Sequence, residues 1–256
     1  MRRPITFDCA GAALVGSLDE ADDAHGLLIV GGGSDVRWGS HRLFARLAQA
    51  LAARGYPVFR FDRRGVGDSD GEDAGYTASG PDIAAALAEF RRLCPRVDRV
   101  TGFGLCDGAT ALALFAPQLD GLILANPWLT EPSDDLPPAA AIRHRYRARL
   151  TSASAWRRAL TGRIDYAKAA RGLARIGRRE AGALGQRVAE AFIGKPATAI
   201  IATGDATAIA ALPFLEDRLP ITRIETASHS FAGEDDFAAL VEAVLHALGQ
   251  QRTRSS

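Results

Sequence analysis

The chain contains little cysteine, and its few cysteines do not form the pattern of a metal site or a disulfide scaffold. Its 256 residues include three of them, Cys9, Cys94 and Cys106, with no C-x-x-C pair. An odd and sparse set argues against a disulfide framework and a zinc site, and it favours a reducing compartment. We therefore expect a cytoplasmic protein that requires neither a metal ion nor an organic cofactor.

Long hydrophobic runs, a strong net charge and nucleotide-binding motifs are also missing. No stretch of about 18 apolar residues occurs, which argues against a transmembrane segment. The basic start Met1-Arg2-Arg3 is not followed by the apolar stretch of a signal peptide. A formal net charge of +1 gives the whole chain no bias toward nucleic acid. Because G-x-G-x-x-G and G-x-x-x-x-G-K-[ST] are both absent, a nucleotide-binding function is weakly supported.

Apolar runs and helical patterns alternate along most of the chain. This alternation predicts a mainly parallel, doubly wound α/β sheet, and the length suits one large domain. The first two strands read as a hairpin, and Ser40 is placed to cap the first helix. The expected strands cover residues 5–9, 12–18, 26–30, 56–61, 97–103, 119–125, 198–203 and 221–226, and the expected helices cover 41–54, 81–93, 109–116, 208–217 and 235–248.

One segment departs from this rhythm and predicts an inserted helical cap. We place the core at residues 1–126 and 196–256 and the cap at 127–195. Between Ile142 and Arg179 twelve residues are basic and only Asp165 is acidic. Such a cap is either a solvated surface or a site that attracts an anion, such as an acyl carrier, a phosphorylated lipid, an acidic glycan or an anionic membrane face. Its candidate substrate-binding residues are Trp128, Tyr146 and Arg145, although the aromatic rings also suit simple packing of the cap.

The most specific motif is Gly104-Leu105-Cys106-Asp107-Gly108, which stands between an apolar run and a helix of small residues. The pattern G-x-C-x-G is that of a nucleophile elbow with cysteine in the usual place of serine. Such a turn forces its middle residue into a strained conformation that exposes the side chain, and the two glycines let strand and helix meet closely. The competing interpretation is a glycine-rich turn with a small buried cysteine.

A cysteine nucleophile needs a base, and the base needs a group that orients it. Asp205 and His229 each follow a predicted strand, so both are expected at the carboxyl edge of the sheet, where such folds place their sites. The chain order nucleophile, acid, histidine fits Cys106, Asp205 and His229. Asp205 also suits a helix cap, and Asp217 is a rival acid at a helix end rather than a strand end.

An oxyanion hole is expected beside the nucleophile. One donor is the backbone N–H of Asp107, the residue after the nucleophile. The second is expected from the glycine-rich loop after the third strand, where we favour Gly33 and keep Gly32 and Ser34 as alternatives. The carboxylate of Asp107 is unusual at this position: it either opposes formation of the thiolate or contacts a polar group of the substrate.

Together with Phe61-Asp62-Arg63-Arg64-Gly65-Val66-Gly67-Asp68-Ser69, these motifs resemble the α/β-hydrolase superfamily over nearly the whole chain. More narrowly, the chain is similar to the exosortase A system-associated hydrolase 1 family. The stretches that carry this narrower likeness are Gly39-Ser40-His41-Arg42, Asn126-Pro127-Trp128, His144-Arg145-Tyr146-Arg147-Ala148-Arg149-Leu150 and Trp156-Arg157-Arg158. The resemblance implies an α/β-hydrolase fold and a bacterial exopolysaccharide and exosortase gene neighbourhood.

We therefore expect a hydrolase, esterase-like or thioesterase-like, that hydrolyses or transfers an acyl group through a thioester on Cys106. Its substrate is expected to be a small or carrier-linked acyl compound. Dienelactone hydrolases also use cysteine, histidine and aspartate on this fold, so cysteine is compatible with hydrolysis. Two other classes stay open: a non-catalytic accessory protein of the exopolysaccharide system, and a thiol sensor that uses Cys106 without turnover.

Overall fold

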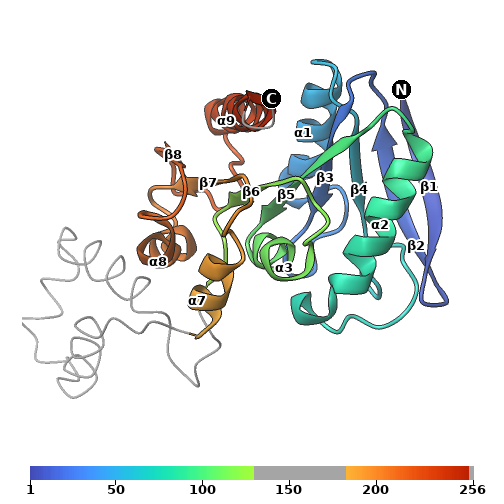
Figure 1. Cartoon of the computed structure of the whole chain (residues 1–256), viewed down its shortest axis with the longest axis horizontal. Coiled ribbons are helices and arrows are strands. Elements are labelled where there is room, and N and C mark those ends of the chain that lie inside the picture. Colours follow the sequence, from blue (N-terminus) through green and yellow to red (C-terminus); the bar gives the residue numbers. More distant parts are fainter. Residues whose placement is uncertain (130–182, 254–256) are drawn as a thin grey trace, which may run out of the picture.

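A single twisted sheet runs through the molecule (Figure 1). The computed structural model describes residues 1–129 and 183–253. In that part of the chain eight strands lie in the order β1-β2-β4-β3-β5-β6-β7-β8. Strand β2 is antiparallel to β1 and β4, and every other neighbouring pair is parallel. The strands are β1 Arg2–Cys9, β2 Ala12–Asp19, β3 His25–Val30, β4 Val58–Phe61, β5 Arg99–Leu105, β6 Gly121–Ala125, β7 Ala197–Ala202 and β8 Ile221–Ile224. The predicted mainly parallel sheet is confirmed.

Helices cover both faces of this sheet because its central strands are apolar on both sides. In β3, Leu27 and Ile29 pack with α1 and α9, whereas Leu28 and Val30 pack with the helices of the other face. Figure 1 shows α1 and α9 on one side and α2, α3, α7 and α8 on the other. The helices are α1 Leu43–Ala52, α2 Gly80–Leu93, α3 Asp107–Phe115, α7 Ala183–Glu190, α8 Ala206–Leu215 and α9 Glu234–Thr253, with short 3₁₀ turns η1 Ser40–Arg42 and η2 Tyr76–Ala78.

The start of the first helix differs from the prediction. Ser40 does not cap it: the Ser40 hydroxyl donates to Asp35 Oδ1 at 3.0 Å, and no side chain caps α1. His41 and Arg42 have positive φ angles of 52° and 61°, so the chain passes through a short 3₁₀ turn before α1 begins at Leu43. The hydroxyl at this position stabilises the preceding loop rather than the helix end.

Two glycines let β5 and α3 meet closely, as the elbow motif predicts. A Cβ atom added at Gly104 would lie 2.5 Å from the backbone of Ala109. A Cβ added at Gly108 would lie 2.5 Å from the carbonyl oxygen of Val30. These distances leave no space for a side chain, so α3 packs directly on the ends of β3 and β5 and carries its first residues to the sheet edge.

Only the two ends of the predicted insertion 127–195 belong to the described residues. Helix α7 comes from its final part, and Leu184 and Val188 bury their side chains in the same apolar cluster as α2 and α3. This helix therefore packs on the core. The basic segment, together with Tyr146 and Arg145, lies outside the described residues. Among the helices that are described, none is long and apolar enough to cross a membrane.

The packing at Gly108 predicts a large difference between two glycine-to-alanine changes. Gly108→Ala is expected to lower the free energy of unfolding by about 1–3 kcal/mol, because the methyl group forces α3 away from β3. Gly249→Ala is the matched control, since a Cβ there would meet nothing within 4 Å and alanine favours a helix interior. Urea unfolding measures both changes. Equal stability of the two variants would contradict the packing account.

Candidate active site

Cys106 occupies the sharp turn between β5, which ends at Leu105, and α3, which begins at Asp107. Its backbone angles are φ 58° and ψ −128°, a conformation that residues other than glycine rarely adopt. The cysteine is only half-buried, although the residues around it on β5 are fully buried. The turn therefore presents the thiol at the edge of the sheet, as a nucleophile elbow does.

Asp205 and His229 meet at the same edge. His229 Nδ1 lies 2.9 Å from Asp205 Oδ2. The same carboxylate oxygen accepts a 3.0 Å hydrogen bond from the Ala208 amide at the start of α8. Asp205 thus acts as a helix cap and as a partner of His229 at once, and both sequence interpretations of this residue hold together. The rival Asp217 follows α8, and the carboxylate that His229 contacts is that of Asp205.

The protonation of this pair is set by its mutual contacts. Hydrogen bonds to Asp205 and to Cys106 raise the pKa of His229 to about 10, against the opposing effect of burial. Burial alone would raise the pKa of Asp205, but hydrogen bonds from His229 and from the Ala208 amide outweigh it and hold the pKa below 3.8. At neutral pH the imidazole therefore carries a proton and the carboxylate does not. His229 is the shared partner of the acid and the thiol.

The other two thiols lack such partners. Cys9 is buried, and burial together with Asp82 raises its pKa to about 11. Cys94 is half-buried at the end of α2, and burial raises its pKa as well. Because the thiolate is the reactive form of cysteine, these environments disfavour reaction at either site.

The side chain of Asp107 lies unexpectedly against the glycine-rich loop after β3. The Gly33 N–H, predicted as an oxyanion donor, donates to Asp107 Oδ1 at 2.5 Å. A Cβ at Gly32 would lie 2.7 Å from the same oxygen and 3.0 Å from Cys106 Cβ, so the carboxylate lies directly over the loop beside the nucleophile. The Asp107 N–H stands at the first position of α3, where an amide has no acceptor within its own helix. Of the two predicted donors, one is therefore already paired with a carboxylate.

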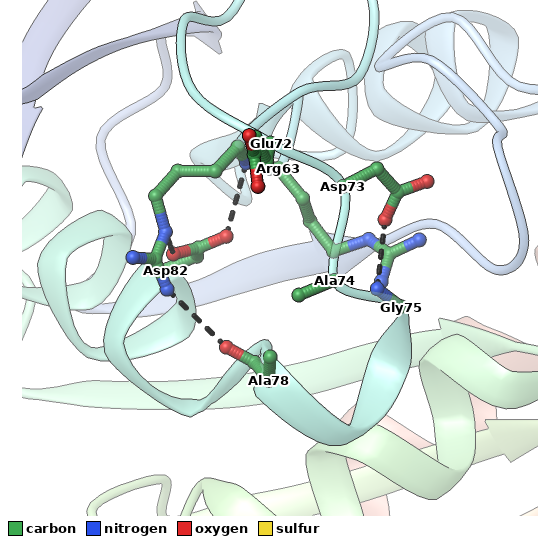
Figure 2. A pocket seen from close by; sticks show the side chains of 8 residues that line it. Arg63, Glu72, Asp73, Ala74, Gly75, Ala78 and Asp82 are labelled. Atoms are coloured by element: carbon green, nitrogen blue, oxygen red, sulfur yellow. Dashed lines mark hydrogen bonds and ion pairs between the residues drawn. The ribbon is translucent and has the colours of Figure 1, made fainter.

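Arg63 holds the other side of the same loop. Arg63 as a whole is 5% exposed, and its guanidinium donates to the carbonyl oxygen of Gly33 and, at 3.0 Å, to Ser79 Oγ. Figure 2 shows Arg63 beside a small pocket formed by the chain after β4 and the start of α2. None of Cys106, Asp205 and His229 lines that pocket. Arg63 thus stabilises the glycine-rich loop through its hydrogen bonds. The sequence motif that contains Arg63 does not reveal this role.

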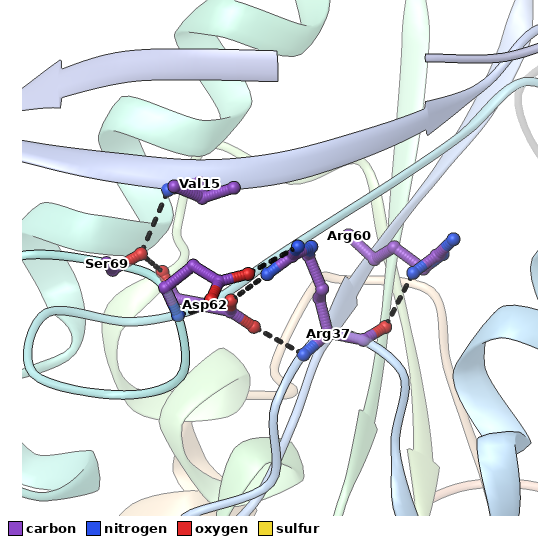
Figure 3. A network of polar contacts seen from close by, with 6 residues as sticks. Val15, Arg37, Arg60, Asp62 and Ser69 are labelled. Carbon is purple, nitrogen blue, oxygen red and sulfur yellow. Dashed lines mark hydrogen bonds and ion pairs between the residues drawn. The ribbon is translucent and has the colours of Figure 1, made fainter. Parts of the chain in front are cut away.

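A buried ion pair fixes the chain that follows the glycine-rich loop. Asp62 is fully buried and accepts hydrogen bonds from the backbone amide and the guanidinium of Arg37 (Figure 3). Arg37 also pairs with Asp68 at 2.7 Å, and its carbonyl oxygen accepts from Arg60 at 2.8 Å. Ser69 links the backbone of Asp62 to Val15 of β2. Because removal of one partner leaves a buried charge, this network holds the loops after β3 and β4 in one arrangement.

Two residues that follow β6 contact the site, one of them predicted and one not. Trp128 is half-buried against the apolar core, and its N–H donates to the carbonyl oxygen of Cys106 at 3.1 Å. Sequence reasoning gave no role to Asn126, whose side chain contacts the backbone of His229. Asn126 is the only asparagine in the chain, a signal that was visible in the sequence.

Within the described ranges, no group of three or more His, Cys, Asp or Glu side chains is arranged to hold a metal ion.

Comparisons with known proteins agree with the fold. Residues 24–243 match the model of the alpha/beta hydrolase family. An esterase of Pyrococcus furiosus is 15% identical, with a TM-score of 0.68 over 98% of this chain and 91% of its own. An alpha/beta hydrolase of a Penicillium species is 16% identical, with a TM-score of 0.68 over 98% and 99%. A serine hydrolase without a lid from Xanthomonas campestris is 19% identical, with a TM-score of 0.62 over 97% and 94%. These structures share the fold, and no curated protein matches the sequence.

The contacts of His229 predict an unusual titration. Its imidazole signals should stay those of the protonated ring through neutral pH and change only near pH 10. Because the folded-state pKa exceeds the ordinary 6.5, the contribution of the ion pair to stability is complete below about pH 6.5 and is lost as pH rises through about 10. NMR of histidine-labelled protein measures the titration, with His229→Gln to assign the signal. Cys106→Ala should lower the pKa; a wild-type midpoint near 6.5 would contradict the described contacts.

Proposed function

The chain belongs to the alpha/beta hydrolase family, and from this premise we propose that it cleaves esters or thioesters through an acyl-enzyme on Cys106. The observation that carries the proposal is the 2.9 Å hydrogen bond between His229 Nδ1 and Asp205 Oδ2, at the sheet edge where Cys106 lies close enough to raise the pKa of His229. Such a chain of acid, imidazole and nucleophile is the arrangement that activates a nucleophile in hydrolases. The strained turn at Cys106 supports it, because it presents the thiol to a substrate.

In the first step the thiolate sulfur of Cys106 attacks the carbonyl carbon of the substrate. The carbonyl electrons move to oxygen, and the tetrahedral intermediate collapses with cleavage of the bond to the leaving alcohol or thiol. The protonated imidazole of His229 donates its proton to that leaving group. The raised pKa of His229 suits this step, because the proton is present at neutral pH.

In the second step water hydrolyses the thioester. Formation of the thioester removes the thiol of Cys106 as a partner of His229, and with it one of the two groups that raise the pKa of His229. The imidazole, now neutral and still oriented by Asp205, takes a proton from water, and the resulting hydroxide attacks the acyl carbon. The C–S bond breaks, the acid leaves, and the thiolate and imidazolium pair forms again. An alcohol or amine in place of water gives acyl transfer.

The oxyanion of both intermediates needs two backbone donors. The Asp107 N–H at the start of α3 is the first. The Gly33 N–H becomes the second when the substrate oxygen displaces the Asp107 carboxylate from it. Arg63 supports this role, because its hydrogen bond to the Gly33 carbonyl oxygen restrains the loop that carries the Gly33 N–H. Each oxyanion donor typically changes kcat by about 10²- to 10³-fold.

The substrate is a small acyl compound, and we infer three finer properties as part of the same proposal. The basic composition of residues 142–179 supports an anionic or carrier-linked substrate. The likeness to the exosortase A system-associated hydrolase 1 family supports a role in an exopolysaccharide system. The three free cysteines support a reducing, cytoplasmic setting. Trp128, next to the elbow, is the described candidate for contact with the acyl chain.

Steady-state kinetics on a panel of p-nitrophenyl esters and acyl thioesters test the proposal. Wild type should turn over at least one activated substrate, with a burst followed by slower deacylation. Cys106→Ala and His229→Ala should each lose about 10³-fold or more in kcat. Cys94→Ala, at the other half-buried thiol, is the control and should keep full activity. Equal rates in Cys106→Ala and wild type would exclude the proposed nucleophile.

The Asp107 carboxylate gives a separate prediction. Asp107→Ala removes the group that occupies Gly33 N–H, so kcat/KM for a small activated ester is expected to rise about tenfold. Asp107→Asn should give a smaller gain, because its amide oxygen can still accept from Gly33. The same ester assay measures both variants. A fall in kcat/KM for both would instead assign the carboxylate a direct contact with the substrate.

A further inference from the structure

The four residues Ala125–Trp128, which we call the bridging segment, contact the nucleophile on both of its peptide groups. The Cys106 N–H donates to the carbonyl oxygen of Ala125 at 3.1 Å, and the Trp128 N–H donates to the carbonyl oxygen of Cys106 at 3.1 Å. The Thr110 hydroxyl of α3 also donates to the carbonyl oxygen of Trp128. The bridging segment therefore holds the turn at Cys106 from one side.

The same segment holds the base through Asn126. Asn126 Nδ2 donates to the carbonyl oxygen of His229 at 2.8 Å, and Asn126 Oδ1 accepts from the Ala202 N–H at the end of β7 at 2.8 Å. Its own N–H donates to the carbonyl oxygen of Ile200 at 2.9 Å. Asp205, the partner of His229, follows Ala202 and donates its N–H to the Ala202 carbonyl at 3.1 Å. One side chain thus links the strand that carries the acid to the loop that carries the base.

The residue type at this position matches the geometry closely. Asn126 is fully buried and has a φ of 41°, a left-handed conformation that asparagine adopts more readily than most residues. Its amide supplies a donor and an acceptor at opposite corners, and both are used. Aspartate would keep the acceptor toward Ala202 and lose the donor toward His229. A buried polar group with both functions satisfied fixes one arrangement of its neighbours.

We propose that Asn126 is a positioning residue that sets the separation of the Cys106 sulfur and the His229 imidazole. The inference rests on the proposed function for its meaning, because it concerns the same site. Asn126 acts through the backbone of His229. Phe231 is fully buried two residues later, and the Ser228 N–H donates to Thr226 Oγ1 at 3.0 Å, so the Asn126 contact is one of several restraints on the His229 loop and the one that comes from the bridging segment.

Loss of the hydrogen bond between Asn126 and His229 would change the rate of acylation and the pKa of His229, whereas a simple loss of stability would change neither in the folded protein. The imidazole would keep Asp205 at Nδ1 but move relative to Cys106, so the acylation step would slow while the substrate still binds. A misplacement of about 1 Å typically slows a positioned reaction about 10²-fold. The proximity of Cys106 also raises the pKa of His229, so a larger separation of the two side chains would lower that pKa.

Asn126→Asp tests the link, because it removes the donor to His229 and keeps the acceptor toward Ala202, and it also buries a carboxylate. We expect kcat to fall about 10- to 100-fold with KM changed less than about twofold. Because a buried carboxylate would itself raise the pKa of His229, the His229 titration is compared in Asn126→Gly, where it should move below that of wild type. Gln251→Glu is the matched control: it makes the same amide-to-carboxylate change at a buried side chain that contacts Thr101 and Leu122, near the starts of β5 and β6. Gln251→Glu should lower stability and leave kcat of the folded protein unchanged.

Two further measurements keep the inference separate from the proposed function. The rate at which iodoacetamide alkylates Cys106, followed on the peptide that carries it, needs no substrate and should fall in Asn126→Asp. Asn126→Gly tolerates a positive φ, buries no charge and removes both side-chain contacts, so it replaces the aspartate variant if that fails to fold. Absence of wild-type turnover alone would overturn the proposed function. Wild-type alkylation rates in both variants, together with a wild-type His229 titration in Asn126→Gly, would overturn the positioning role.

Discussion

The left-handed turn at Cys106 is the constraint on which the site depends. A residue with φ 58° and ψ −128° between a buried strand and a helix persists only when its surroundings hold it there. Gly104 and Gly108 permit the close approach of β5, α3 and β3, and the bridging segment fixes both peptide groups of the cysteine. The half-buried thiol at the sheet edge, the N–H at the start of α3 and the nearby glycine-rich loop all follow from this one turn.

The charged side chains around Cys106 determine which chemistry the turn can support. The imidazole of His229 is hydrogen-bonded to the Asp205 carboxylate, and both Asp205 and Cys106 raise its pKa. The Asp107 carboxylate is the unusual member, because it accepts from the Gly33 N–H, which the proposed reaction assigns to the oxyanion. In the proposed reaction this carboxylate favours substrates whose carbonyl oxygen competes well for Gly33, and it disfavours poorly activated ones. A cysteine nucleophile in place of serine likewise favours activated acyl groups in the proposed reaction.

Local chemistry in the sequence predicted the fold and the position of Asp205 and His229 at one edge of the sheet, whereas the catalytic roles of the site residues stay predictions. The elbow motif, the alternation of strands and helices, and the position of Asp205 and His229 after strands depend on backbone rules that act over short distances. One missed contact is local, because the hydroxyl of Ser40 donates to Asp35, five residues earlier, instead of capping α1. The other missed contacts depend on residues far apart in the chain. The Asp107 carboxylate reaches a loop 74 residues away, and Asn126 reaches His229 over 103 residues. No periodicity or motif encodes such pairs, because they form only after the strands align.

The most direct test of the account is the chemical location of the acyl group during turnover. The protein would be mixed with an acyl thioester at neutral pH, quenched in acid, digested and analysed by mass spectrometry. The account predicts about one acyl group per chain, on the peptide that carries Cys106, and its disappearance in Cys106→Ala. Turnover with the acyl group on another residue, or with no covalent intermediate and an unmodified Cys106, would contradict it.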